Sequence, residues 1–112
     1  APFHCSLMKK AEENMKSKIT DAVLKKPNPG IISNVTAKME NDPTIIKELL
    51  IKQITSTVRW RESLQYMINN GIDQFIEIGP GKVLSGLVKR TNRKIKISNL
   101  NSLEDVNNYK NK

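Results

Sequence analysis

The sequence is poor in the residues that build disulfides, metal cages and stacking surfaces. With one cysteine and one histidine in 112 residues, it offers no internal disulfide and no cysteine-based zinc site. Aromatic residues make up only 4%, and no basic run is interleaved with Phe or Tyr, as a single-strand nucleic-acid binder would require. No apolar run reaches the roughly 18 residues of a membrane span, and no signal-type stretch is present. We therefore expect a reducing, cytoplasmic setting and neither nucleic acid nor a membrane as partner.

A complete nucleophilic apparatus is also lacking. No Gly-x-Ser-x-Gly elbow is present to expose a serine on a strained turn. The only imidazole, His4, stands just before an amphipathic stretch, where it is either a surface histidine or half of a catalytic pair. The neighbouring Cys5 points in a different direction at a helix start, which favours a packing role for it. If His4 is catalytic, we expect its nucleophile upstream of these residues.

Positive charge is what the chain has in excess. Lys and Arg number 19 against 11 acidic residues, a net charge of +8, which favours an acidic partner. Many of these cations fall in the first third of the chain, at Lys9, Lys10, Lys16, Lys18, Lys25 and Lys26. They form either an ordinary solvated helix face or a surface for an acidic protein.

The periodicity of apolar residues alternates between helical and extended. Helical stripes are predicted from Leu7 to Val23, from Pro43 to Ile54 behind an Asp42 cap, from Trp60 to Asn70-Gly71, from Val83 to Val88, and from Ser102 for a short last helix. Short β-branched runs predict strands at Ile31–Val35, Phe75–Ile78 and Ile95–Ile97. Strands separated by helices indicate an α/β fold with mainly parallel pairing. The polar tail from Asn107 to Lys112 is expected to fray.

Two further places have both a plain and a functional interpretation. Gln53 falls three and four residues after Leu50 and Leu49, in or beside an apolar stripe, where it either reaches solvent or orients another residue. Gly79-Pro80-Gly81-Lys82 joins a strand to a helix, a place where an anion can bind. It lacks the spacing of a P-loop, and its glycines are better explained by a sharp turn into the helix.

Four ordered motifs together resemble a known family. They are Phe3-His4-Cys5-Ser6-Leu7-Met8-Lys9, Asn34-Val35-Thr36-Ala37, Lys52-Gln53-Ile54 followed by Val58-Arg59-Trp60, and Glu77-Ile78-Gly79-Pro80-Gly81-Lys82-Val83-Leu84-Ser85-Gly86-Leu87. Their order and spacing resemble the C-terminal part of the malonyl-CoA:acyl carrier protein transacylases, over essentially the whole chain. One departure is Thr57, where many members have proline. The resemblance implies the C-terminal portion of an α/β-hydrolase-like acyltransferase core, with the nucleophile-bearing part and a ferredoxin-like subdomain outside residues 1–112.

The resemblance also implies a reaction and roles. Malonyl would pass from malonyl-CoA to an upstream serine, and then to the phosphopantetheine thiol of acyl carrier protein, with no cofactor besides these two substrates. His4 would be the general base and then the general acid, Gln53 would hold it through a carbonyl, and Phe3 would favour malonyl over branched acyl groups. The alternative from the residues alone is a basic α/β binding module for an acidic partner, without chemistry of its own.

Overall fold

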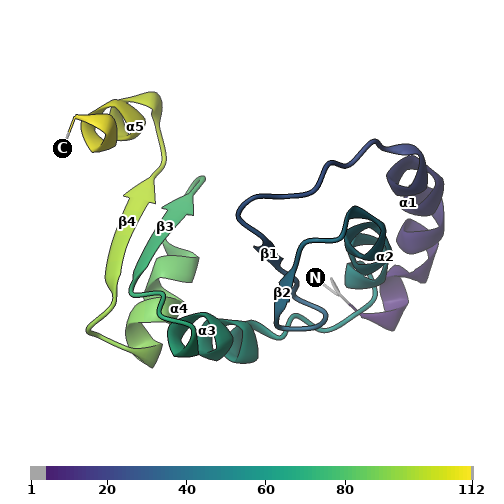
Figure 1. Cartoon of the computed structure of the whole chain (residues 1–112), viewed down its shortest axis with the longest axis horizontal. Helices are drawn as coiled ribbons and strands as arrows, with labels where there is room; N and C mark the ends of the chain where they lie inside the picture. Colours follow the sequence, from purple (N-terminus) through teal and green to yellow (C-terminus); the bar gives the residue numbers. More distant parts are fainter. Residues whose placement is uncertain (1–4, 112) are drawn as a thin grey trace. The chain divides into compact units, whose positions relative to one another are not determined.

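The computed structural model describes residues 5–111 and divides the chain into two compact units, residues 1–67 and 68–112 (Figure 1). Each unit has its own small sheet. The first unit contains a two-stranded antiparallel sheet, and the second contains a two-stranded parallel sheet. The predicted α/β class is confirmed, although one of the two pairings in the described residues is antiparallel.

The first unit opens with a short 3₁₀ turn, η1 (Ser6–Met8), that continues into α1 (Lys9–Asp21). The predicted helix to Val23 ends two residues early, because Ala22 is already extended at φ −65° and ψ 141°. Val23 lies beyond the end of α1, and its side chain is 89% exposed, so it does not belong to the buried face of the helix. The end of α1 is tied to α2 by the Lys47 ammonium, which donates to the Thr20 carbonyl at 2.8 Å.

The second helix, α2 (Pro43–Gln53), begins as its sequence predicts. The Asp42 carboxylate accepts from the Thr44 amide at 2.9 Å, and Pro43 occupies the first helical turn, where a missing N–H costs nothing. Ile46 and Leu49 are buried on one side of the helix. Both line a cavity together with Gln53, at the end of α2, and with β1.

The predicted strand Ile31–Val35 is wrong in length, and its pairing is antiparallel where parallel pairing was expected. Only β1 (Ile31–Ile32) is extended, and it pairs antiparallel with β2 (Met39–Glu40). The intervening residues form a tight turn, in which the buried Ser33 hydroxyl accepts from the Val35 amide at 3.1 Å. Ala37 takes a left-handed φ of 55°, which closes the turn.

The boundary between the units falls within α3 (Trp60–Asn69), after Met67. This helix ends as predicted. The Gly71 amide donates to the Ile68 carbonyl at 3.1 Å, and Gly71 has φ 90°, a left-handed conformation that glycine adopts without steric cost.

The second unit is a strand–helix–strand arrangement. β3 (Gln74–Ile78) and β4 (Lys96–Leu100) pair in parallel, with Gln74 opposite Lys96 and Ile78 opposite Leu100, and α4 (Val83–Thr91) connects them. The parallel prediction is therefore confirmed for this pair. Val88 of α4 and Ile95, just before β4, are buried in this unit.

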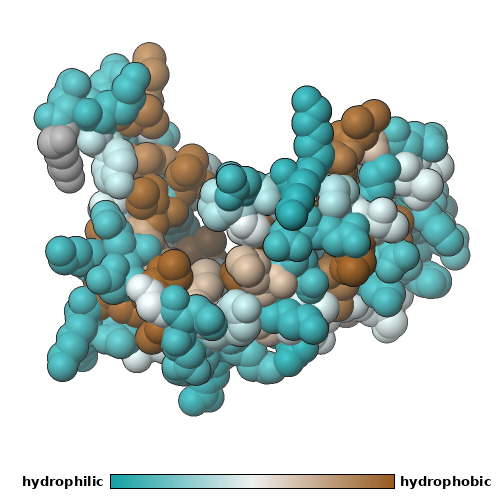
Figure 2. All heavy atoms as spheres, viewed as in Figure 1, coloured by the Kyte–Doolittle hydropathy of each residue, from teal (hydrophilic) through white to brown (hydrophobic). Residues whose placement is uncertain are grey.

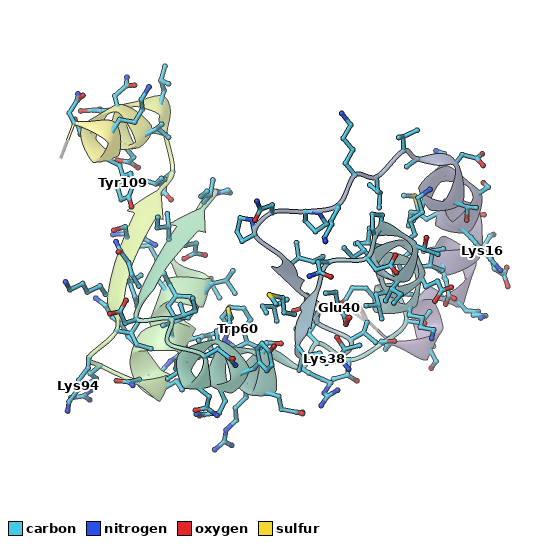
Figure 3. The ribbon with its side chains drawn as sticks, viewed as in Figure 1. Lys16, Lys38, Glu40, Trp60, Lys94 and Tyr109 are labelled. Carbon is cyan, nitrogen blue, oxygen red and sulfur yellow. The ribbon has the colours of Figure 1, made fainter. Side chains whose placement is uncertain are left out.

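The last helix, α5 (Leu103–Lys110), is longer than the sequence suggested. The Ser102 hydroxyl accepts from the Asp105 amide at 3.2 Å, so the predicted cap is confirmed. Residues 107–110, expected to fray, remain helical. Tyr109 in this turn is half-buried, and Figure 3 shows it beside the end of β4.

Apolar side chains remain uncovered in the second unit. Ile78 is 78% exposed, Val83 73% and Leu103 75%. Figure 2 shows apolar side chains gathered over the ends of β3 and β4 and beside α5. Only one face of this sheet is therefore well covered by the residues described.

Candidate functional site

Gln53 lies at the carboxyl end of α2 and is half-buried, as its place on the apolar stripe predicts. It lines a cavity of about 120 Å³ with three other residues of α2 and with the β1 segment: Ile31, Ile32, Ser33, Asn34, Ile46, Leu49 and Leu50. Cavities that enclose a drug-sized ligand have at least roughly 300 Å³. This cavity is thus too small for a coenzyme and suits a single side chain or a few waters.

The turn beside this cavity is held by Arg59. The Arg59 amide donates to the Asn34 carbonyl at 3.1 Å, and its guanidinium donates to the Val35 carbonyl at 3.2 Å. The same guanidinium pairs with the Glu62 carboxylate. Two of the sequence motifs, Asn34–Ala37 and Val58–Trp60, are thereby joined in space.

A second polar cluster, which the sequence did not reveal, lies in the other unit. One oxygen of the Glu77 carboxylate accepts from the Ser85 hydroxyl at 2.7 Å, from the Ser85 amide at 3.0 Å and from the Asn99 amide side chain at 3.2 Å. Its other oxygen accepts from the Leu84 amide at 3.3 Å. The Asn99 side chain also donates to the Ser85 hydroxyl. We call Glu77, Ser85 and Asn99 the carboxylate cluster.

Two interpretations of Gly79–Lys82 were open, an anion site and a sharp turn, and the hydrogen bonds of the carboxylate cluster favour the turn. The amides at the start of α4 donate to Glu77, so the chain's own carboxylate occupies the place where a phosphate would bind. Gly79 and Gly81 have φ of 128° and 82°, conformations that side-chain-bearing residues rarely adopt. The glycines therefore serve the turn.

The cluster shifts the titration of Glu77. Hydrogen bonds from the Ser85 hydroxyl and then from the Ser85 amide stabilise the ionised form, and they hold the pKa of Glu77 below its usual value. A carboxylate at the N-terminus of a helix also complements the positive end of the helix dipole. The charge of Glu77 therefore stabilises the fold of this unit.

Two of the three predicted site residues, Phe3 and His4, lie outside the residues that the structure describes. Gln53 is placed, and Cys5, next to His4, is half-buried. Within residues 5–111 no group of three or more histidine, cysteine or acidic side chains is arranged to hold a metal ion. No helix in the same range is long and apolar enough to cross a membrane.

Sequence reasoning also missed a basic surface at the end of α4. Lys89, Arg90 and Arg93 line an open cleft of about 510 Å³. The signal was present in the sequence as a long interval without acidic residues, from Ile78 to Leu103.

Comparison with known proteins gives a consistent result. A malonyl CoA-acyl carrier protein transacylase of Staphylococcus aureus is 44% identical over 108 residues, which are 96% of this chain and 35% of that protein. The crystal structure of an acyl-carrier-protein-S-malonyltransferase from Bartonella henselae is 38% identical and superposes with a TM-score of 0.89, covering 97% of this chain and 35% of that one. No protein-family profile matches the sequence.

A third relative was solved with its partner. It is a malonyl-transacylase in complex with its type II PKS acyl-carrier protein, 29% identical, with a TM-score of 0.85 over 100% of this chain and 37% of that one. In both fold and sequence, this chain is therefore similar to part of these proteins. It is homologous to the malonyl CoA-acyl carrier protein transacylases, and it spans about a third of their length.

Proposed function

We propose that this chain is the C-terminal portion, residues 1–112, of the acyltransferase domain of a malonyl-CoA:acyl carrier protein transacylase of fatty acid synthesis. The observation that carries the proposal is sequence identity of 44% along 96% of the chain, with all four motifs in order. The two substrates are malonyl-CoA and phosphopantetheinylated acyl carrier protein. We expect no cofactor and place the reaction in the cytoplasm, which suits a chain with a single cysteine.

The reaction is a double displacement, in which His4 moves one proton at each step. An upstream serine gives its hydroxyl proton to His4 and attacks the thioester carbon, and the departing CoA sulfur then takes that proton. In the second half, the carrier thiol gives its proton to His4 and attacks the malonyl-serine ester. The serine oxygen leaves and recovers the proton. His4 is thus base and acid in turn, and the serine is regenerated.

Gln53 is proposed as the residue that positions His4. A carbonyl of Gln53 would accept the ring N–H of His4, the role that a carboxylate has in most serine triads. Its position at the C-terminus of α2 supports this role, because that end of a helix carries partial negative charge and stabilises an imidazolium nearby. Phe3 is proposed to fill the space that a branched acyl group would need.

The proposal is tested by following malonyl on the full-length protein. Incubation with malonyl-CoA should add one malonyl group to the protein, detectable by intact mass, and release one CoA. Addition of carrier protein bearing phosphopantetheine should move the group to the carrier thiol. A protein that takes up no malonyl, yet binds an acidic protein, would instead support the binding-module alternative.

A further inference from the structure

One turn of the first unit forms part of the wall of the cavity that Gln53 lines. This turn, residues 33–37, joins β1 to β2, and its first two residues, Ser33 and Asn34, line the cavity of about 120 Å³ together with Gln53. The turn is closed by the Ala37 amide, which donates to the Ser33 carbonyl at 2.8 Å. A displacement of the turn would therefore change the surroundings of Gln53.

Arg59 holds this turn from the loop between α2 and α3. Its amide donates to the Asn34 carbonyl at 3.1 Å, and its guanidinium donates to the Val35 carbonyl at 3.2 Å. The Glu62 carboxylate accepts from Nε of the same guanidinium at 3.1 Å and fixes its direction. Arg59 follows Gln53 along the chain, after the end of α2, so it ties the segment that leaves Gln53 to the turn beside the cavity.

The backbone of Arg59 is anchored independently of its side chain. The Arg59 carbonyl accepts from the amide of Ser63 at 2.9 Å and from its hydroxyl at 2.8 Å, and Ser63 is 2% exposed. Replacing the Arg59 side chain therefore removes the bond to Val35 and leaves the start of α3 in place.

The guanidinium contributes more to geometry than to stability. The side chains of Arg59 and Glu62 are 42% and 59% exposed, and exposed ion pairs contribute little to the free energy of folding. The bond to the Val35 carbonyl nevertheless fixes one position of the turn. A contact that is weak in stability but defined in geometry suits a role in placing other residues.

We propose that Arg59 is a positioning residue for malonyl transfer: by holding the Val35 carbonyl, its guanidinium fixes the turn beside Gln53 and thereby keeps Gln53 where it holds His4. The inference rests on the proposed function, which gives Gln53 that role, and adds the residue that supports it. Catalytic groups need placement within about 0.5 Å, which the residues packed around them provide. A misplacement of about 1 Å can cost roughly a hundredfold in rate, so even a small loosening of the turn should be measurable.

The test uses the full-length protein with three variants. Arg59→Met keeps an unbranched side chain and removes the donors, whereas Arg59→Lys returns a cationic donor for the Val35 carbonyl. Arg61→Met is the matched control, because Arg61 is an exposed residue of α3 and its replacement removes the same charge while leaving the bonds of Arg59 intact. Circular dichroism and thermal melting verify that each variant folds.

Malonyl loading is measured in a single turnover. For Arg59→Met we expect the maximum loading rate to fall about tenfold, with the half-saturating malonyl-CoA concentration within about twofold of wild type. Transfer to the carrier thiol should slow by the same factor, because His4 moves a proton in both steps. Arg59→Lys should recover the rate to within about threefold of wild type, and Arg61→Met should behave as wild type.

A second background separates positioning from general support of the fold. If Arg59 acts by placing His4, Arg59→Met should change the residual loading rate of a His4→Ala protein by less than about twofold, because the group to be placed is gone. A contact that only supports the fold would cost the same factor in both backgrounds.

Four results would overturn the positioning role. They are an unchanged loading rate in Arg59→Met, no recovery in Arg59→Lys, an equal loss in Arg61→Met, and a loss of the same size in the His4→Ala background. Failure of Arg59→Met to fold would also overturn it, because the guanidinium would then be structural. All of these leave malonyl loading of the wild-type protein intact. Absence of that loading would overturn the proposed function itself.

Discussion

A single carboxylate organises the second unit. Glu77 stands near the end of β3, and its oxygens reach the first amides of α4 and the side chain of Asn99 on β4. One side chain thus links the two paired strands and the helix between them. Such links are invisible in sequence, because the partners are eight and 22 residues away.

This carboxylate should make acid stability depend on Glu77. Since its pKa is lowered in the folded state, its contribution is present above the unfolded value of about 4.3 and is lost as the pH falls through the lower folded value. Replacing Glu77 with Gln should lower the unfolding free energy at neutral pH and flatten its fall below about pH 4.3. Denaturant unfolding at a series of pH values measures both effects.

Glu48→Gln is the matched control. Glu48 is an exposed acid in the middle of α2, away from the helix ends and outside the carboxylate cluster, so its replacement should change stability little. If Glu77→Gln and Glu48→Gln give the same profile, Glu77 contributes nothing specific to the fold.

His4 should be indispensable for chemistry and dispensable for folding. In the full-length protein, His4→Ala should reduce malonyl transfer by roughly a thousandfold or more, the loss typical of removing a nucleophile's base. The melting temperature should change little. Turnover near that of the wild type in a folded His4→Ala protein would remove His4 from the mechanism.

Sequence alone singled out candidate site residues only where the type of side chain is itself unusual for its position. His4 is the sole imidazole, and Gln53 stands out as an amide on an apolar stripe. The role of Arg59 was not predictable, because it binds backbone carbonyls, and any residue in the facing turn would offer the same acceptors. Glu77 stands in a conspicuous motif, but spacing alone does not reveal that its carboxylate folds onto α4.

At the scale of elements, the helices were predicted better than the strands. Helix starts such as Asp42-Pro43 and Ser102 are set by local side-chain chemistry that is legible in sequence. The run from Ile31 to Val35 has the composition of a strand, yet the hydrogen bond that the Val35 amide donates to the Ser33 hydroxyl and the left-handed Ala37 convert most of it into a turn. Local hydrogen bonds and backbone conformation decide such cases, and composition does not.

Two glycines should respond to alanine in opposite directions. Gly71, at φ 90° after α3, should lose about 1 kcal/mol of stability on replacement by Ala, because the left-handed conformation is strained for any residue with a Cβ. Gly86 lies within α4, and an added Cβ would have the Arg90 guanidinium as its nearest neighbour at 3.9 Å. Gly86→Ala should therefore gain about 0.5–1 kcal/mol from helix propensity.

Denaturant unfolding of the two variants beside the wild type measures both changes. Open space surrounds Gly71, so a loss there reports backbone strain and not a clash. Destabilisation by Gly86→Ala, or none by Gly71→Ala, would contradict the conformations described.

As a whole molecule, residues 1–112 expressed alone should be catalytically silent and prone to association. Ile78, Val83 and Leu103 are each more than 70% exposed, and the β3–β4 sheet has two open edges among the described residues. Such surfaces favour self-association. Sedimentation over a range of concentrations should show oligomers or aggregates, and incubation with malonyl-CoA should add no mass.

A monomer that unfolds cooperatively would refute the packing half of this prediction. A covalent malonyl adduct on Cys5 or on a serine of this segment would refute the catalytic half. The two outcomes are independent, because one depends on uncovered apolar surface and the other on the absence of the upstream nucleophile.

The carboxylate cluster has a consequence for free anions in solution. Because Glu77 is tethered to the same chain as the amides it binds, its effective concentration there is on the order of millimolar or higher. A phosphate or nucleotide would have to displace this internal competitor before it could reach α4. The same check applies to other glycine-rich turns that join a strand to a helix. An acidic residue two positions before the first glycine, as Glu77 is to Gly79, argues against assigning a nucleotide to the turn.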